Sequence, residues 1–451
     1  MNKNLLYILI FQFLFLSNFA QTPLSGTFSS DTVLQSSLSP YLMSTSITIN
    51  SGATFDVEPG TIIYIENNAS IIVSYANLNF NGEINDSIHL LNNTTKWSRI
   101  SGDHANINIS YCVIKHATQI LSANYGEIRM DNSRCDSVTG GDVVAIHYAD
   151  TVVVNDCNFA GIKNTAKIDC IDADGINYGL FYNNRFTNWN DDAIDIGTGA
   201  TNVSIHHNYF ENNDYGVSLG ESSVASVYRN VMYEGTGGMQ THTGAVLTAY
   251  NNTVYKTYFG IQCYHGGTSN SGGTAYIRNT IFSNPDFCSI AVQPTSYVEV
   301  TYSCSEIDTM VGVGNIVGYP NFVDTANLDF HLFAGSICIN AGDPSDPLDT
   351  NGNFIDIGAF EYYDTSSVSN EILENIDIKI YPNPTTGIFL IEGQNIKNIE
   401  IIDITGKTIK TLQGIQNFKA YKIDLGNNSK GIYFIRLIKE DCVIFKKVIL
   451  N

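Results

Sequence analysis

One position recurs along the chain between residues 112 and 304, and its spacing constrains the fold more than any other feature of the sequence. Each occurrence is a Cys or an Asn that closes a short apolar run with the alternating pattern of a β-strand. Successive occurrences lie 22 to 27 residues apart without a helical pattern, which predicts a solenoid with one coil per period. The recurring residues are Cys112, Cys135, Cys157, Asn184, Asn208, Asn230, Asn252, Asn279 and Cys304.

The residue type at this position fits a parallel β-solenoid. Coils stack at ~4.8 Å, so a recurring Asn can bond both to the turn backbone and to the Asn above and below it. A Cys fits the same slot as a small apolar residue. The column resembles that of secreted right-handed parallel β-helix proteins over residues 105–317. Proteins of that fold include lyases, hydrolases, adhesins and inert stalks, so the fold alone does not define a function.

The two ends of the chain predict export. Residues 1–20 contain Lys3, an apolar stretch and Ala20, the pattern of a signal peptide, and no other apolar run is long enough to span a membrane. Short alternating strands near the C-terminus predict a small antiparallel β-sandwich. Motifs at 378–387, 399–407 and 431–437 resemble the type A sorting domain of the type IX secretion system of Bacteroidetes. This resemblance implies Sec export, passage through the type IX machinery, and release or attachment to the outer-membrane surface.

Charge divides the chain and narrows its partners. The formal net charge of −21 argues against nucleic acid as a partner. Residues 1–370 hold 12 Lys+Arg against 35 Asp+Glu, whereas 371–451 hold 11 against 9, which indicates a domain boundary. We expect an all-β chain with a signal peptide (1–20), N-terminal capping coils (21–104), a β-helix body (105–317), a closing module (318–363), a linker (364–376) and a sorting domain (377–451).

Two further expectations concern calcium and cysteine. In the closing module, which is similar to the tail that closes many secreted β-helices, Asp349, Asn351 and Asn353 offer oxygen ligands at alternate positions. They are candidate metal ligands, with calcium as the candidate cofactor. The chain has nine cysteines. Stacked neighbours in a parallel sheet rarely present the Cβ directions that a disulfide needs, so buried free thiols are expected.

The second strand of each coil can be aligned across the body, with alternate residues facing solvent. The alignment predicts an outward column formed by Ala145, Asp169, Asp195, Ser218, Gln240 and Gln262. It predicts a second column after each strand, formed by His147, Gly197, Gly220, His242 and Tyr264.

Carboxylates are densest where two of these coils meet. Asp169 and Asp191 are 22 residues apart, and Asp172 and Asp195 are 23 apart, so both pairs are separated by about one coil. At least two carboxylates should therefore lie within a few ångströms across adjacent strands. Like charges separated by so short a distance must share a proton, bind a cation or move apart. The candidate catalytic residues are Asp169, Asp174, Asp191, Asp192 and Asp195.

Three interpretations of this cluster remain open. Hydrolysis needs two carboxylates with separated pKa values, and Asp174, Asp191 and Asp192 distantly resemble the Asp pattern of polygalacturonases, without that family's Gly-His-Gly motif. Elimination by a polysaccharide lyase needs a cation, which the cluster could hold, and a base. In the third interpretation, the carboxylates bond the backbone of coil corners.

Aromatic residues suggest where a glycan could bind. Tyr182, Tyr228 and Tyr250 precede the column Asn by two residues and form an outward row that includes His206. Sugar rings stack on such rows, but cross-strand aromatic packing explains the row equally well. The candidate substrate-binding residues are Tyr182, His206, Tyr228, His242 and Tyr264.

These features together predict an exported cell-surface or extracellular β-helix protein that binds an extracellular polysaccharide and is a candidate for cleaving it by hydrolysis or elimination. The alternative is a non-catalytic surface adhesin or a structural solenoid.

Overall fold

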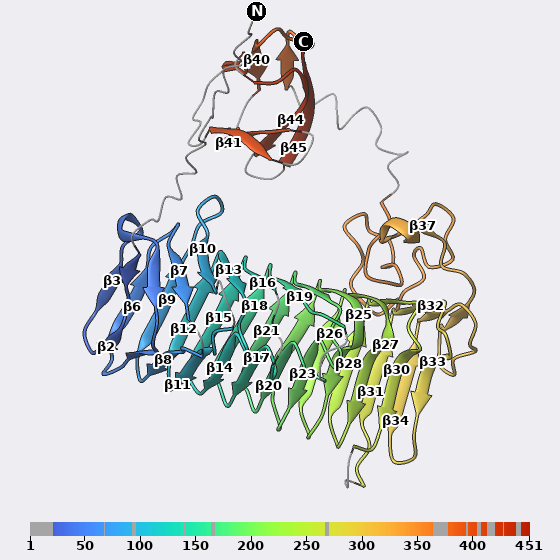
Figure 1. Ribbon diagram of the computed structural model, residues 1–451. Coiled ribbons are helices and arrows are strands. Elements are labelled where there is room, and N and C mark those ends of the chain that lie inside the picture. The colour runs from blue at the N-terminus through green and yellow to red at the C-terminus, as the bar shows by residue number, and fades with distance from the viewer. Residues whose placement is uncertain are drawn as a thin grey trace, which may run out of the picture. The chain divides into compact units, whose positions relative to one another are not determined.

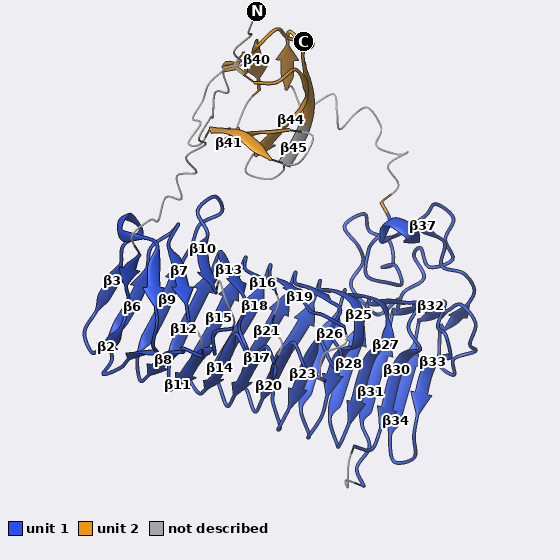
Figure 2. Ribbon diagram, in the orientation of Figure 1, with its two compact units in different colours: residues 1–362 blue, residues 363–451 orange. Residues whose placement is uncertain are grey.

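The computed structural model describes residues 21–451 except 67, 93–95, 137, 139, 164–166, 267–269, 364–377, 394–395, 404–406, 413–419, 427 and 439–442. The chain forms two compact units, Met1–Tyr362 and Tyr363–Asn451 (Figure 2). The predicted signal peptide and linker lie outside the described residues.

The first unit is a parallel β-solenoid with three faces, as predicted (Figure 1). The strands of the first face are β1 (Thr22–Pro23), β4 (Tyr41–Met43), β7 (Ile62–Ile65), β10 (Ile88–Leu91), β13 (Cys112–Lys115), β16 (Arg134–Asp136), β19 (Asn158–Ala160), β22 (Arg185–Thr187), β29 (Thr253–Tyr255), β32 (Ile281–Ser283), β35 (Cys304–Ser305) and β36 (Ile316–Val317). The strands of the second face are β2 (Gly26–Phe28), β5 (Ile47–Ile49), β8 (Ile71–Ser74), β11 (Ile100–Asp103), β14 (Leu121–Asn124), β17 (Val144–His147), β20 (Ile171–Asp174), β23 (Ile194–Gly197), β30 (Phe259–Tyr264) and β33 (Cys288–Val292).

Two long strands, β25 (Tyr209–Leu219) and β27 (Val231–His242), run from the first face into the second and join them into one sheet. The strands of the third face are β3 (Thr32–Leu34), β6 (Thr54–Val57), β9 (Asn77–Asn81), β12 (Asn106–Ser110), β15 (Glu127–Asp131), β18 (Thr151–Asn155), β21 (Gly179–Tyr182), β24 (Val203–His206), β26 (Val224–Tyr228), β28 (Val246–Tyr250), β31 (Thr274–Arg278) and β34 (Tyr297–Thr301). A 3₁₀ helix, η1 (Ser36–Leu38), lies between β3 and β4, where the first coil leads into the second.

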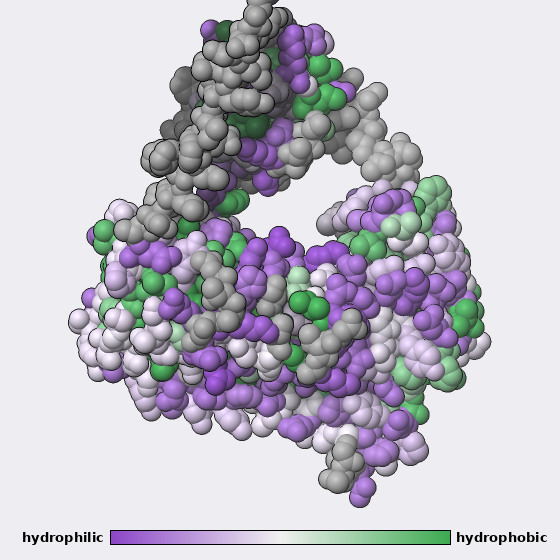
Figure 3. Space-filling model, viewed as in Figure 1, coloured by the Kyte–Doolittle hydropathy of each residue, from purple (hydrophilic) through white to green (hydrophobic). Residues whose placement is uncertain are grey.

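The core of the solenoid follows from alternation along each strand. One side of every strand carries Ile, Val, Leu or Phe into the interior, where like residues stack from coil to coil. Phe159, Phe186 and Phe210 stack in this way, with successive ring centroids 5.1 Å apart. The outer side is largely hydrophilic on the face seen in Figure 3, with scattered hydrophobic residues.

The asparagine column holds the turn between the third and first faces. Asn184, Asn208 and Asn230 each donate a side-chain hydrogen bond of 3.0–3.1 Å to the amide oxygen of the next Asn. That same oxygen accepts the backbone N–H of the residue one coil earlier, at 2.9–3.0 Å. The column therefore pairs buried backbone groups that the turn would otherwise leave unpaired.

The prediction that Cys135, Asn279 and Cys304 belong to the column is wrong. Cys135 pairs with Ile114 in the strand, and Ser133 Oγ accepts the Cys112 N–H at 2.9 Å instead. At the other end, the hydroxyls of Thr280 and Ser303 take the positions predicted for Asn279 and Cys304. A hydroxyl accepts the same backbone N–H as an amide oxygen, so the column continues through residues that the Asn/Cys pattern excludes.

Replacing Asn230 with Ala should destabilise the solenoid by about 3 kcal/mol, because buried backbone groups at 205 and 208 would lose their partners. Thermal unfolding of the variant measures this loss. Asn124→Ala serves as the control, since Asn124 is exposed at the end of β14 and has the extended backbone of a strand, and it should unfold close to the wild type. Equal melting temperatures for the two variants would contradict the role of the column.

Residues 318–362 pack along the side of the last coils, against the first face (Figure 1). This closing module contains β37 (Phe322–Asp324), η2 (Thr325–Asn327) and β38 (Asp329–Leu332). Phe322, Phe330 and Ile357 share one buried apolar cluster with Val231 and Ile281 of the solenoid. The guanidinium groups of Arg278 and Arg229 form ion pairs of 2.9 Å with carboxylates of the module, those of Asp346 and Glu361 respectively.

The second unit is the predicted small antiparallel sandwich. One sheet contains β39 (Lys379–Tyr381), β40 (Ile388–Glu392) and β43 (Ala420–Asp424), and the other contains β42 (Thr408–Leu412), β41 (Asn398–Asp403), β44 (Gly431–Ile438) and β45 (Val443–Leu450). Side chains including Phe389, Ile401 and Ile435 form its own apolar core. In the described part of the chain, no helix has the length and apolar character needed to cross a bilayer.

Candidate functional site

The predicted acidic residues gather on the second face and in the turns that lead into it. Strand pairing aligns Asp172 with Asp195, and Asp195 with Ser218 and then Gln240. The predicted alignment is therefore correct except for Asp169, whose place belongs to Asp172. The predicted exposure of this column is wrong for Ala145, Ser218 and Gln240, which are buried. Asp169 lies instead in the turn between β19 and β20, because the strand begins at Ile171 and not at Ile168.

Asp169, Asp191 and Asp192 form a carboxylate cluster at this turn, in which Asp192 is buried and the other two are partly exposed. One carboxylate oxygen of each lies within 4.8 Å of the other two. Asp169 Oδ1 accepts the backbone N–H of Asp192 at 2.8 Å. The Asp192 side chain is only 6% exposed, and its Oδ2 accepts a hydrogen bond of 2.9 Å from Gln240 Nε2. Its other oxygen, Oδ1, is buried and has no hydrogen-bond partner among the described residues.

Burial and mutual repulsion disfavour the charged forms of these carboxyls. Burial, with further contributions from Asp192 and Asp195, raises the pKa of Asp169 to about 9. Burial also raises the pKa values of Asp191 and Asp192. Lys167 Nζ lies 3.5 Å from Asp191 Oδ1 and 3.2 Å from Asp214 Oδ2. Its side chain is 73% exposed, so the solvent screens much of its attraction for the cluster.

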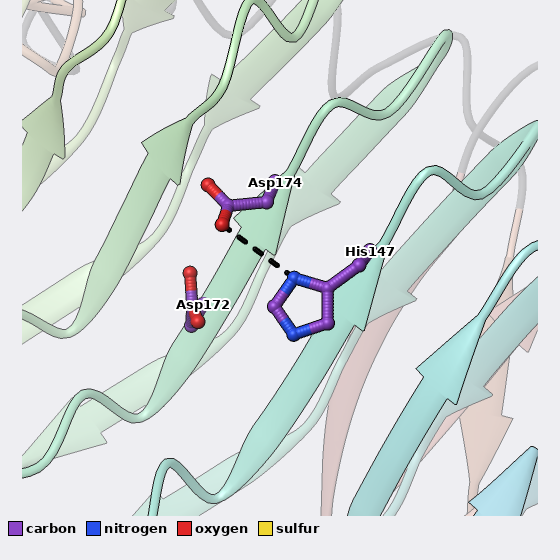
Figure 4. Close-up of side chains that lie close together, drawn as sticks. All are labelled: His147, Asp172 and Asp174. Atoms are coloured by element: carbon purple, nitrogen blue, oxygen red, sulfur yellow. Dashed lines mark ion pairs between the residues drawn. The ribbon is translucent and has the colours of Figure 1, made fainter.

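A second group lies beside the first on the strands themselves. His147, Asp172 and Asp174 each place one ligand atom within 4.8 Å of the other two, and His147 Nδ1 is 3.5 Å from Asp174 Oδ2 (Figure 4). Burial, together with Asp174 and Asp195, raises the pKa of Asp172 to about 8. Burial raises the pKa of Asp195 to about 6 despite a hydrogen bond from Ser218. Asp195 pairs with Asp172 and also contributes to the raised pKa of Asp169, so it lies between the two groups. We call the two groups together with Asp195 the acidic strip.

His242 and Tyr264 share this face with the carboxylates. They are aligned in adjacent coils, with ring centroids 5.0 Å apart. The neighbouring coils carry glycine at this position. A Cβ at Gly220 would lie 2.5 Å from His242 Cε1, and one at Gly197 would lie 2.4 Å from Asp174 Oδ1. The side chains of His242 and Asp174 therefore each lie over a glycine of the neighbouring coil. Burial lowers the pKa of His242, so its imidazole is neutral at neutral pH.

The other three candidate substrate-binding residues lie elsewhere. Tyr182, His206 and Tyr228 are on the third face, and the structure does not bring them to the carboxylates. Their rings stack on one another with centroids 5.2 and 4.7 Å apart. Ring faces that cover each other are less available to a sugar, so this geometry matches the cross-strand packing alternative. Sugar binding on the third face stays a prediction.

The predicted calcium ligands of the closing module form a turn of their own. Asp349 Oδ1 accepts the backbone N–H groups of Asn351 and Asn353, both at 2.8 Å. Calcium binding there stays a prediction. Within the described ranges, the groups of three side chains that could hold a metal ion are the two on the acidic strip.

Two neighbours of the cluster, Lys167 and Asp214, were not among the candidate residues predicted from the sequence. Asp214 lies 23 residues after Asp191, which is the coil spacing already used for the other carboxylates. That spacing alone would have placed it beside Asp191. Lys167 had no comparable signal, because it lies outside the strands, between β19 and β20.

Known proteins match the two units separately. Residues 162–304 match the family described as right handed beta helix region, and residues 379–451 match the secretion system C-terminal sorting domain. No curated protein is significantly similar to the chain. A solved structure titled "Crystal structure of pectate lyase Pel9A" is 16% identical, with 75% of this chain and 87% of that chain covered and a TM-score of 0.34. Similarity at this level transfers neither an activity nor a substrate.

The fold and the matches define the class. The protein is a right-handed parallel β-helix protein with a type IX secretion sorting domain, and that domain directs it to the extracellular space or the cell surface.

Proposed function

We propose that this protein binds an acidic polysaccharide outside the cell, through a divalent cation held by Asp169, Asp191 and Asp192. The observation that carries the proposal is the buried Asp192 oxygen without a hydrogen-bond partner, inside a cluster whose three carboxylate oxygens lie within 4.8 Å of one another. A buried carboxylate in that position needs either a proton or a cation.

Calcium fits the donor set best. All three ligands are carboxylates, and hard oxygen ligands are those that calcium prefers. Calcium takes six to eight oxygens, so three side chains leave coordination positions for water and for a ligand. A uronate carboxylate supplies an oxygen of the same kind. The protein's net charge of −21 would otherwise repel such a polyanion, so a cation bridge explains how an acidic chain binds an acidic glycan.

The spacing suits a cation. One carboxylate oxygen from each of the three residues lies within 4.8 Å of the other two, so a single ion between them could contact all three.

Cleavage by elimination is a second candidate function, and His242 favours it. Elimination needs a neutral base to take the proton from C5 while a cation stabilises the carboxylate of the same sugar. The His242 imidazole has a pKa lowered by burial and faces the side of the solenoid that carries the cluster.

The test measures binding of the purified protein to polygalacturonate, alginate and a neutral glucan, in calcium and in chelator. We expect binding to the polyuronides in calcium only, and no binding to the neutral glucan. Binding unaffected by chelation would overturn the cation bridge. Unsaturated products from the same mixtures would establish elimination, and their loss in His242→Ala with binding retained would assign the base.

A further inference from the structure

We propose that Cys304 and Cys338 form a disulfide bond in the exported protein, which fastens the closing module to the solenoid. Cys304 opens β35 in the last coils, and Cys338 belongs to the closing module, 34 residues later. The bond would join the last coils of the solenoid to the closing module.

The two thiols meet inside one apolar cluster. Cys304 and Cys338 are both 0% exposed and share this cluster with Phe322, Phe330 and Ile357. Both are free thiols in the structure, and they lie close enough that Cys304 contributes to raising the pKa of Cys338. Cys304 Sγ also lies 3.4 Å from the carbonyl oxygen of Gly318, where the module begins. Contact between two thiols is the geometric condition that most cysteine pairs in a fold do not meet.

Three cysteines of the body, Cys112, Cys135 and Cys157, do not align with one another in adjacent coils. Cys112 and Cys157 both align with Ser133, so they lie two coils apart, at roughly 9.6 Å by the strand spacing, beyond disulfide range. Cys135 is shifted along its strand, against Ile114 and Phe159. The expectation of buried free thiols is therefore kept for the stacked cysteines, and the proposal departs from it for one pair.

Export takes the protein into an oxidising compartment, where the bond can form. The sorting domain sends the protein through the periplasm, where disulfides form and persist. The two thiols lose two protons and two electrons as the S–S bond forms, and a disulfide donor, such as a thiol oxidoreductase, accepts them and is reduced to a dithiol. Contact with Cys304 and burial raise the pKa of Cys338, which disfavours its thiolate, so the bond forms before the cluster closes.

Peptide mapping tests the bond directly. The full chain is exported to a bacterial periplasm, alkylated without reduction, and digested after Glu. Cleavage after Glu299, Glu306 and Glu361 separates residues 300–306 from residues 307–361, each with one cysteine. We expect these two peptides to remain linked until reduction, and seven of the nine cysteines to be alkylated after unfolding. Separate peptides and nine alkylated cysteines would overturn the proposal.

Thermal unfolding gives an independent readout. Closing a 34-residue loop should raise the melting temperature, so reductant should lower that of the wild type by about 5–10 °C. Cys338→Ser should melt near the reduced wild type and should not respond to reductant. Cys288→Ser, a partly exposed thiol outside the cluster, should respond as the wild type does. Equal responses of all three proteins would also overturn the proposal.

Discussion

Replacing Asp192 with Asn should abolish calcium binding and stabilise the calcium-free protein. Asn keeps the shape of the side chain and can still accept the Gln240 hydrogen bond. It removes a buried carboxyl that, without calcium, must either hold a proton or stay ionised with no hydrogen-bond partner for Oδ1 among the described residues. Calcium affinity should fall at least about 100-fold, as expected when a charged ligand is lost. Without calcium, the free energy of unfolding should rise on the order of 1–3 kcal/mol. Calorimetric titration and thermal unfolding in chelator measure the two effects.

A matched control lies on the same face. Asp103 ends β11 and aligns with Asn124 of the next coil, so Asp103→Asn introduces a residue that this column already contains. This variant should change neither calcium affinity nor stability. If Asp192→Asn bound calcium as tightly as Asp103→Asn, the cluster would not be the cation site. A loss of stability in Asp192→Asn without calcium would show that the ionised carboxylate is satisfied in the fold.

The fold could be predicted because the same interaction repeats in many coils. The Asn184–Asn252 column identified the coil length from sequence, since a buried turn needs an acceptor at one fixed place. The prediction failed at Ser133, Thr280 and Ser303 because small hydroxyls serve the same backbone donor. Residue identity is therefore a weaker signal for this position than hydrogen-bonding capacity.

The site could be predicted only as far as coil length fixes it. Spacings of 22 and 23 residues placed the carboxylates in adjacent coils, and the structure has Asp172 beside Asp195. The sequence did not show which carboxylates lie in strands and which in turns, because Ile168–Cys170 and Ile171–Ala173 both alternate. Ten residues separate β19 from β20, whereas six separate β22 from β23 in the next coil, and that difference in length moved Asp169 out of the strand.

The calcium-free protein should lose stability as the pH rises from about 5 to about 9. Asp169, Asp172 and Asp195 have pKa values of about 9, 8 and 6 in the folded chain, against about 3.9 when unfolded. The folded state therefore holds protons that the unfolded state releases. This contribution is complete below the unfolded pKa and is lost as the pH passes the folded values, at about 1.4 kcal/mol per pH unit for each proton. Thermal unfolding in chelator, with the pH raised in steps from 5 to 9, measures the loss as a continuous fall in melting temperature.

Calcium should reverse this dependence, because the cation binds the deprotonated carboxylates and competes with protons. Its affinity should therefore increase over the same pH range in which the calcium-free protein weakens, and the two melting curves should diverge as the pH rises. Asp169→Asn should flatten the pH dependence in chelator, since it removes a carboxyl whose pKa of about 9 makes it release its proton within this range. Asp103→Asn should leave it unchanged. Parallel curves with and without calcium would mean that the carboxylates relieve their repulsion by sharing protons, and that the acidic strip holds no cation.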